Sequence, residues 1–372
     1  MESYSSLPKP WGRARIDYSA VNEYIHAHYD SMEEQQSTSY FPQSIIEEDV
    51  YNAREGVFYY SQYLANPSLE TCGFTLLQND ESISTKITDW TDWTQLCQHY
   101  FPQLDQSIRE TLRQEQNDNL SIQHLVLWHP ILRGTDLNIT TTSKNTTNGK
   151  TSESKSAVVV QTASVASLVH IDTDIGALTL SQLLDLIQNN SIRYPNSQTF
   201  CRTTIEKDIE NGCRFMIVNA WRNADTTSNN TPISSYPLGI FATQYYSNHT
   251  QQDEDDFDKN PHLTFFPMCR PDPHQSQWYT YPNMTTNECL LFKQYDRDAS
   301  KMSDLWHCAL NLVMPQQHQN RRSFDVRAFV VLKEKVSYNV DRWSHRHPSK
   351  LTLEESGCFC DEQAEKHKIS NS

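Results

Sequence analysis

The sequence predicts a mainly β fold with flanking helices, a double-stranded β-helix (jelly roll). The main observation is a series of strand-like segments between His262 and Leu332, separated by clusters of Pro, Asn and Asp. The segments are LTFF, WYTY, CLLFKQY, CALNLV and DVRAFVVL. Several short strands at this spacing are typical of an all-β barrel or sandwich. Helical patterns are concentrated before them, so we expect the helices to pack against the sheets.

Two segments predict such helices. Apolar residues spaced i, i+3, i+6 and i+10 suit one helix face, and they are Trp90, Trp93, Leu96 and Tyr100. Thr179 to Gln182 resembles a capping box, and the apolar stripe around it predicts a helix that faces the core. That stripe consists of Leu180, Leu183, Leu184 and Ile187.

Four further segments predict strands ahead of the C-terminal series. Residues 121–128 (SIQHLVLW) predict a strand that ends at His129 and Pro130. Residues 157–163 (AVVVQTA) and 166–171 (ASLVHI) are rich in β-branched and other apolar residues. Residues 213–221 (CRFMIVNAW) are apolar on both faces, which predicts a strand buried between layers.

The length of 372 residues is enough for a full core, and we expect one single domain over residues 1–372. Residues 1–50 are polar and aromatic, which favours an N-terminal arm, extended or with short helices. Residues 134–156 lose all hydrophobic pattern and predict a polar surface insert. The tail over residues 341–372 is rich in His, Lys and Glu and predicts a peripheral segment.

Charge and motifs exclude several classes of function. The formal net charge is −15, and nucleic-acid or anionic-membrane partners would require basic patches. The chain contains neither a G-x-G-x-x-G nor a Walker A sequence, which argues against dinucleotide and P-loop sites. The N-terminus lacks an apolar signal-peptide core, and the nine cysteines show no disulfide framework. We therefore expect a reduced cytoplasmic protein.

The segment LVHIDTD is the strongest candidate for a metal site. On a strand, residues two apart point to the same face, so His170 and Asp172 would present an imidazole and a carboxylate side by side. His307 lies in a later strand-like segment and can add a second imidazole. Two His and one carboxylate hold non-haem iron and leave positions open for a cosubstrate and dioxygen. We predict that these three residues bind Fe(II).

A candidate anchor for a carboxylate follows fourteen positions after His307. Arg321, Ser323 and Arg327 fall on one alternation of the segment RRSFDVRAFVVL. An Arg and a hydroxyl two apart on a strand can grip one carboxylate, the Arg through a bidentate fork. The neighbouring Ser323 favours Arg321 over Arg327 as the anchor, and both remain candidates.

Plainer interpretations compete with each of these residues. The chain has fourteen histidines, and a single His near a strand is more often structural than a ligand. Either arginine could simply pair with a carboxylate such as Asp325 or Glu288. His129 could be a fourth ligand, although its place before a proline favours a structural or substrate-contact role. Three further histidines lie in the polar C-terminal tail and are expected to be solvated: His345, His347 and His367.

The ensemble of motifs resembles the fungal hydroxylase/desaturase group of the Fe(II)/2-oxoglutarate-dependent oxygenases. This group includes a gibberellin desaturase and relatives of a cephamycin-biosynthesis protein. The matching positions run from about Arg54 to Arg327 and comprise Arg54, Gly73-Phe74, His129, Arg133, Asn219-Ala220-Trp221-Arg222, Pro237-Leu238, Trp278-Tyr279, Met284, Glu288, Leu291 to Asp296, and Arg321 to Arg327. The chain departs from the pattern at Thr173-Asp174, Phe324 and Asp325.

The resemblance implies an enzyme that uses Fe(II), 2-oxoglutarate and dioxygen to hydroxylate or desaturate a small-molecule substrate of secondary metabolism. It implies that Arg321 and Ser323 hold the far carboxylate of 2-oxoglutarate. Two alternatives are a non-catalytic binding protein on the same fold and a metal-dependent enzyme that does not use 2-oxoglutarate. The sequence leaves the substrate and the oligomeric state open.

Overall fold

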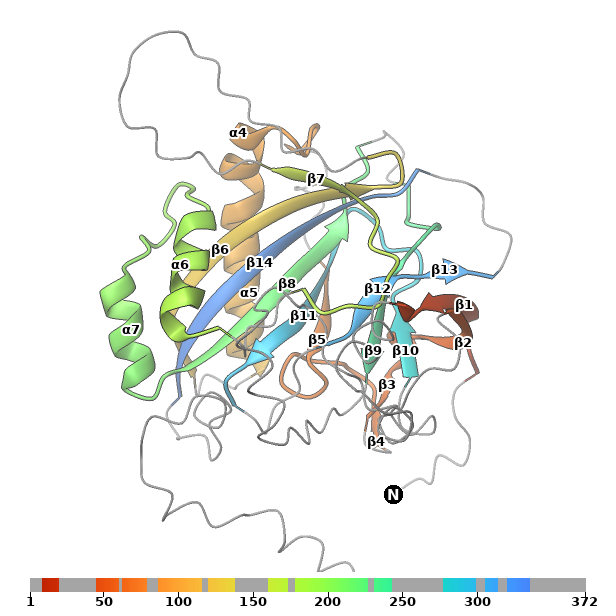
Figure 1. The fold of residues 1–372 in the computed structure, drawn as a ribbon, viewed down its shortest axis with the longest axis horizontal. Coiled ribbons are helices and arrows are strands. Elements are labelled where there is room, and N and C mark those ends of the chain that lie inside the picture. The colour runs from red at the N-terminus through yellow and green to blue at the C-terminus, as the bar shows by residue number, and fades with distance from the viewer. Residues whose placement is uncertain are drawn as a thin grey trace, which may run out of the picture.

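Two six-stranded sheets form the centre of the molecule (Figure 1). The computed structural model describes residues 9–19, 45–59, 62–78, 86–115, 120–137, 160–172, 178–226, 231–242, 277–298, 305–313 and 320–334. The major sheet has the strand order β5-β11-β8-β14-β6-β7, and the minor sheet has the order β12-β9-β10-β2-β1-β13.

The major sheet contains the longest strands. Its members are β5 (Phe74–Gln78), β6 (Leu120–Gly134), β7 (Gln161–Ser164), β8 (Arg214–Asn223), β11 (Glu288–Asp296) and β14 (Arg322–Glu334). The minor sheet contains β1 (Gly12–Asp17), β2 (Ile45–Asn52), β9 (Leu238–Ala242), β10 (Gln277–Thr280), β12 (His307–Ala309) and β13 (Asn311–Leu312). A small hairpin adds β3 (Val57–Tyr59) and β4 (Gln62–Leu64).

The order in which the chain visits the sheets is that of a jelly roll. From β6 in the major sheet the chain crosses to the edge of the minor sheet, where Leu168 and His170 form bridges with Asp17 and His307. It then passes to β8 in the major sheet, to β9 and β10 in the minor sheet, to β11, to β12, and finally to β14 in the major sheet. The predicted mainly β fold, a double-stranded β-helix, is confirmed.

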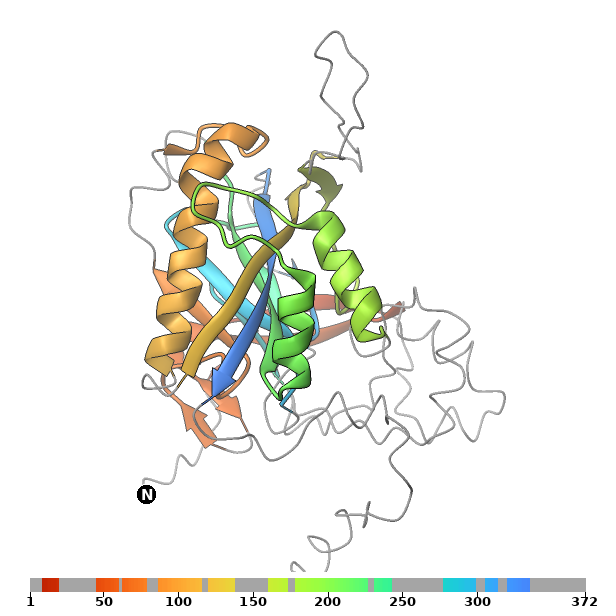
Figure 2. The same cartoon turned by 90° about the vertical axis from the view of Figure 1, so that its left-hand side faces the viewer.

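Helices cover both faces of the major sheet (Figure 2). On the outer face lie α4 (Trp93–Gln95), η2 (Leu96–Tyr100) and α5 (Phe101–Glu115), of which α5 packs its apolar side against β6, β8 and β14. The short η1 (Ala53–Glu55) follows β2 instead, and its Ala53 is buried among residues of both sheets. On the other face α6 (Leu180–Asn190) and α7 (Arg202–Glu210) cover one end of the same strands. The remaining inner face of the major sheet is therefore turned toward the minor sheet, and this is where polar side chains collect.

The local patterns predict most of these elements correctly. All ten residues of β8 are buried, as expected for a strand between layers. The capping box is formed as predicted, because the Thr179 side chain accepts from Gln182 and the Gln182 side chain accepts from Thr179. The Trp93 to Tyr100 segment is helical and continues into α5, whereas Trp90 lies in the turn before it.

The strand predicted to end at His129 and Pro130 is longer. β6 runs on to Gly134, because His129 adopts a positive φ of 53° and the chain forms a bulge instead of a turn. Ile131 pairs with Asp325 and Trp128 with Arg327, so two residues of β6 lie opposite one residue of β14.

The expected N-terminal arm is also corrected. β1 and β2 pair with each other and are integral strands of the minor sheet, because Ala14, Ile16 and Val50 bury their side chains in an apolar cluster with Trp278 and Phe241 of the same sheet. The strand predicted at residues 263–266, most of the polar insert and the whole C-terminal tail lie outside the described residues. None of the helices in the described ranges is long and apolar enough to cross a membrane.

Candidate metal centre

His170 and His307 are brought together by a bridge between backbone segments. The two residues pair antiparallel, with the His170 N–H donating to the His307 carbonyl at 3.1 Å and the His307 N–H donating back at 3.0 Å. Residues paired in this way carry their side chains on the same face. The two imidazole centroids are consequently 4.3 Å apart.

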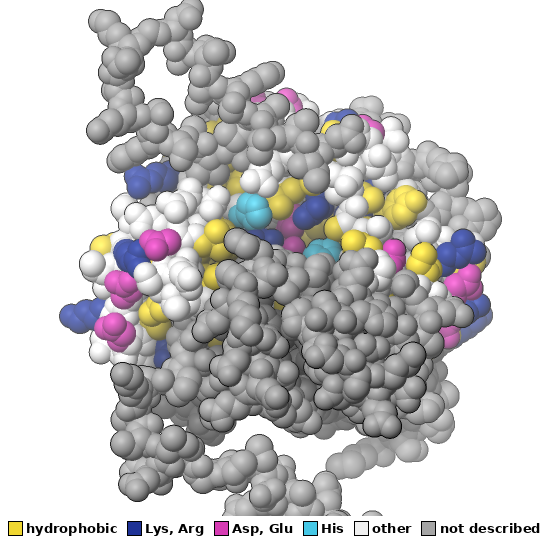
Figure 3. Space-filling view, in the orientation of Figure 1, with side chains coloured by type: hydrophobic (Ala, Val, Ile, Leu, Met, Phe, Trp, Pro, Cys, Tyr) yellow, Lys and Arg dark blue, Asp and Glu magenta, His cyan; other side chains and the backbone are white. Residues whose placement is uncertain are grey.

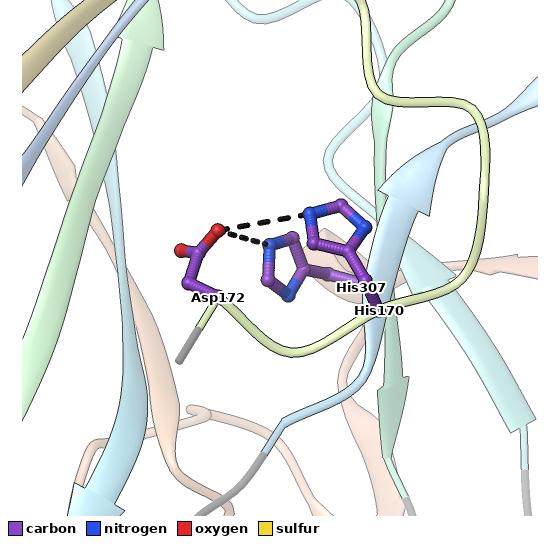
Figure 4. Close-up of side chains that lie close together, drawn as sticks. All are labelled: His170, Asp172 and His307. Atoms are coloured by element: carbon purple, nitrogen blue, oxygen red, sulfur yellow. Dashed lines mark ion pairs between the residues drawn. The ribbon is translucent and has the colours of Figure 1, made fainter. Parts of the chain in front are cut away.

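Asp172 completes a cluster with these two side chains (Figure 4). Its Oδ1 atom lies 3.7 Å from the Nε2 atom of His170 and 3.7 Å from the Nε2 atom of His307. One ligand atom from each of the three residues lies within 4.8 Å of the others. No other group of three or more His, Cys, Asp and Glu side chains in the described ranges has this spacing. The three predicted metal ligands are thus adjacent.

Both histidines present the nitrogen that a metal would use. The Nδ1 atom of His170 is 2.7 Å from the Leu168 carbonyl, and the Nδ1 atom of His307 is 3.1 Å from the Leu305 carbonyl. A carbonyl only accepts, so each Nδ1 carries the proton and each Nε2 keeps its lone pair. Burial and the neighbouring His170 lower the pKa of His307, which keeps that ring neutral and able to bind a metal. This donor set fits a divalent ion such as Fe(II).

Two further side chains hold the carboxylate of Asp172. Arg327 places Nη2 at 3.3 Å from Oδ1, and the Asn219 side-chain amide donates to Oδ2. The backbone N–H of Asp172 donates to Gln294 at 2.9 Å. Burial alone would raise the pKa of Asp172, but the charge of Arg327 holds it well below its usual range. The residue is therefore an anion with a fixed orientation.

The inner face of β14 and the residue before it carry the other predicted residues. Arg321 is 4% exposed, and it donates to the Tyr236 carbonyl at 2.8 Å and to the Ser323 hydroxyl at 2.9 Å. Its guanidinium lies over the Trp221 ring, 5.1 Å from the centroid. In the described ranges Arg321 forms no ion pair with a carboxylate. Burial and the charge of Arg133 lower the pKa of Arg321 to about 9. An anion bound beside Arg321 would therefore stabilise its charged form.

A cavity connects the metal cluster with Arg321. Its walls include all three candidate metal ligands, and the other lining residues are Arg133, Ala166, Trp221, Leu238, Phe292, Ala309, Arg321 and Asp325. The cavity volume is about 20 Å³, which is enough for about one ion or water molecule. Figure 3 shows histidine, basic and acidic side chains gathered near the centre of this face of the molecule. A second cavity, of about 240 Å³, shares Arg321 in its wall.

The structure separates the two candidate anchors. Arg327 pairs with Asp172, whereas Arg321 lines the cavity without an acidic partner in the described ranges and donates to the Ser323 hydroxyl. Glu288 pairs with Arg54 instead, at 2.7 Å. His129 stacks on Trp128, and its Nε2 lies 3.4 Å from Gln161.

Asn219 and Asp325 have places in the site that the sequence analysis did not assign. Asn219 is a polar residue inside an apolar, fully buried strand, and a buried amide requires a hydrogen-bond partner. That signal was present in the sequence, but its partner, Asp172, is distant along the chain. Asp325 is 6% exposed and lines the cavity, and burial together with Asp172 raises its pKa to about 7.

Comparisons with known proteins give limited similarity. The family model described as "YDMC: Oxidoreductase/YMDC permease-like domain" matches residues 195–331, less than half of the chain. No curated protein matches the sequence. The chain is similar to the solved structure of the iron and alpha-ketoglutarate-dependent endoperoxidase NvfI, with 16% identity and a TM-score of 0.47 over 77% of this chain and 86% of that chain. A different conformation of NvfI gives 17% identity and a TM-score of 0.47. Similarity of this size carries no argument about function, so the function is argued from the site.

Proposed function

We propose that this chain is an Fe(II)- and 2-oxoglutarate-dependent oxygenase that hydroxylates or desaturates a small molecule. The observation that carries the proposal is the convergence of the Nε2 atoms of His170 and His307 on Oδ1 of Asp172. A site of two imidazoles and one carboxylate leaves positions on iron for a cosubstrate and dioxygen. When bound, iron and 2-oxoglutarate would together supply the oxidising power.

The chain's own residues hold and shield that centre. The carbonyls of Leu168 and Leu305 fix the orientation of the two imidazoles, and such partners typically change metal affinity by about 10–100-fold. Arg327 and Asn219 fix the carboxylate of Asp172. Apolar lining residues such as Phe292, whose ring lies 4.9 Å from that of His307, exclude water from the reacting groups.

Arg321 and Ser323 would hold the far carboxylate of 2-oxoglutarate. Arg321 is buried in the cavity wall beside the metal cluster, and in the described ranges it has no carboxylate partner of its own. A buried guanidinium without a counter-ion is costly, and a bound dicarboxylate would remove that cost. The cavity has room for about one ion or water, so the lining side chains must move apart when the cosubstrate binds.

We further propose that the chain is of the fungal hydroxylase/desaturase type and acts on a secondary metabolite. Several residues of the matching motifs have specific contacts that support this. Arg54 donates two hydrogen bonds to Glu288, at 2.7 and 3.0 Å, although the two residues are far apart in the sequence. Asn219 contacts Asp172, and Trp221 lies beneath Arg321.

The test is formation of succinate and of product by the purified protein supplied with Fe(II), 2-oxoglutarate and dioxygen. We expect succinate formation that depends on iron and is lost in His307→Ala. His99→Ala, which removes a histidine of η2 remote from the site, should leave it unchanged. Candidate substrates would come from comparing metabolites of the producing organism with and without this gene.

The outcomes separate the alternatives. Product without succinate would indicate a metal-dependent enzyme that does not use 2-oxoglutarate. Absence of both, in protein that binds iron and is correctly folded, would indicate a binding protein on the same fold. Either result contradicts the proposed function.

A further inference from the structure

Three arginines face the cavity or its metal ligands, and two of them have an assigned anion. Arg327 pairs with Asp172, and Arg321 is the proposed anchor of the cosubstrate. Arg133 is the third. Its only hydrogen bond to the described residues is a long one, 3.4 Å from Nη1 to the Ser164 carbonyl, and it forms no ion pair with a carboxylate of those residues.

The register of the major sheet explains why Arg133 faces the site. Arg133 on β6 pairs directly with Ser323 on β14, and Ser323 pairs on its other side with Asn223 of β8. Directly paired residues carry their side chains on the same face of the sheet. Arg133 is therefore next to the proposed cosubstrate anchor, on the wall shared with the metal ligands.

The neighbouring positions on this wall also show polar groups without partners. Asp325 pairs in register with Trp221, and both line the cavity. The Oδ1 atom of Asp325 and the indole N–H of Trp221 have no hydrogen-bond partner among the described residues. Most buried polar atoms in proteins are bonded, so unpartnered atoms on one cavity wall indicate that a polar ligand binds there.

The charges of the site leave one anion missing. Three arginines and a divalent metal ion face two carboxylates of the protein and one dicarboxylate cosubstrate, so the complex would carry an excess positive charge. Arg133, which is half-buried, is the residue whose charge has no assigned anion. An excess charge in a partly desolvated site is stabilised when a ligand of opposite charge binds.

We infer that Arg133 binds a carboxylate of the primary substrate, so that the substrate is a small organic acid. A guanidinium binds a planar carboxylate through two parallel hydrogen bonds. The inference rests on the proposed function, because it assigns Arg321 to the cosubstrate and leaves Arg133 for the substrate.

The experiment uses the full chain loaded with Mn(II) and with N-oxalylglycine, an unreactive analogue of 2-oxoglutarate that occupies the anchor at Arg321. The probes are aliphatic, aromatic and polycyclic carboxylic acids, each paired with its primary amide, and binding is measured by calorimetry or saturation-transfer NMR. We expect at least one acid to bind about tenfold or more tightly than its amide. Arg133→Gln should abolish this preference, and Arg133→Lys should retain part of it.

The matched control is Arg322→Gln, because Arg322 pairs with Asp136 outside the site. Acids that bind no better than their amides, or a preference that survives in folded Arg133→Gln, would overturn the inference while N-oxalylglycine still binds. Loss of N-oxalylglycine binding in Arg133→Gln would also overturn it, by assigning Arg133 to the cosubstrate. If N-oxalylglycine does not bind the unmodified protein, the proposed function itself fails.

Discussion

Replacing Arg321 tests the cosubstrate anchor most directly. In the structure its two Nη atoms donate to the Tyr236 carbonyl and to the Ser323 hydroxyl. A carboxylate that binds Arg321 must take over at least one of these donors, and the net gain is about one charge-assisted hydrogen bond. Such a bond contributes about 1.5–3 kcal/mol, so Arg321→Gln should weaken 2-oxoglutarate binding by about 10–150-fold.

The assay is anaerobic calorimetry of 2-oxoglutarate with the Fe(II)-loaded protein. Arg321→Gln should keep its iron, because the guanidinium forms no contact with Asp172 or either histidine in the structure. Ser323→Ala should show the same change to a smaller extent, because it removes one hydroxyl and leaves the charge in place.

Arg327→Gln is the matched comparison on the same strand face. Arg327 contacts Asp172, so its loss should lower iron affinity by about 10–100-fold. If Arg327→Gln keeps iron and loses 2-oxoglutarate, while Arg321→Gln binds 2-oxoglutarate normally, then Arg327 is the anchor. That result would refute the reasoning from the two sets of contacts.

Three further outcomes are expected. His307→Ala should bind no stoichiometric iron by metal analysis yet keep its circular dichroism, and unchanged iron content would exclude it as a ligand. Gly239→Ala should destabilise the fold by about 1–3 kcal/mol in urea unfolding, because a Cβ atom there would lie 2.6 Å from Cγ of the buried Leu310. Gly12→Ala is its control, since nothing lies within 4 Å of the added atom, and equal losses would contradict the packing argument. Burial raises the pKa of Glu115 from 4.5 to about 7, so the stability that it contributes is fully present below pH 4.5 and is lost as the pH rises through 7. Between pH 5 and pH 8 the free energy of unfolding of Glu115→Gln should therefore fall less than that of the unmodified protein, by on the order of 1–3 kcal/mol. Parallel pH profiles of the two proteins would disprove this.

The sequence by itself determined the elements whose signal is local. The buried strand β8, the capping box at Thr179 and the strand-like segments of the C-terminal half follow from patterns within about ten residues. The pairing of an imidazole with a carboxylate two residues later is also local, which is why His170 and Asp172 could be proposed as ligands. The order of the motifs added His307 and Arg321 as candidates.

The tertiary structure decided the contacts between distant segments. The positive φ of His129 turns an expected strand end into a bulge, and this depends on pairing with β14. The N-terminal residues become strands because the minor sheet offers them partners and a core to cover.

The contacts of the arginines were decided in the same way. Alternation along β14 puts Arg321 and Arg327 on one face, and the sequence cannot say which of them meets Asp172. Only the register with β8 and β6 places Arg327 beside that carboxylate and Arg133 beside Ser323. Cross-strand pairing joins residues far apart in the chain, so the charge balance of the site is a property of the folded sheets and not of any single segment.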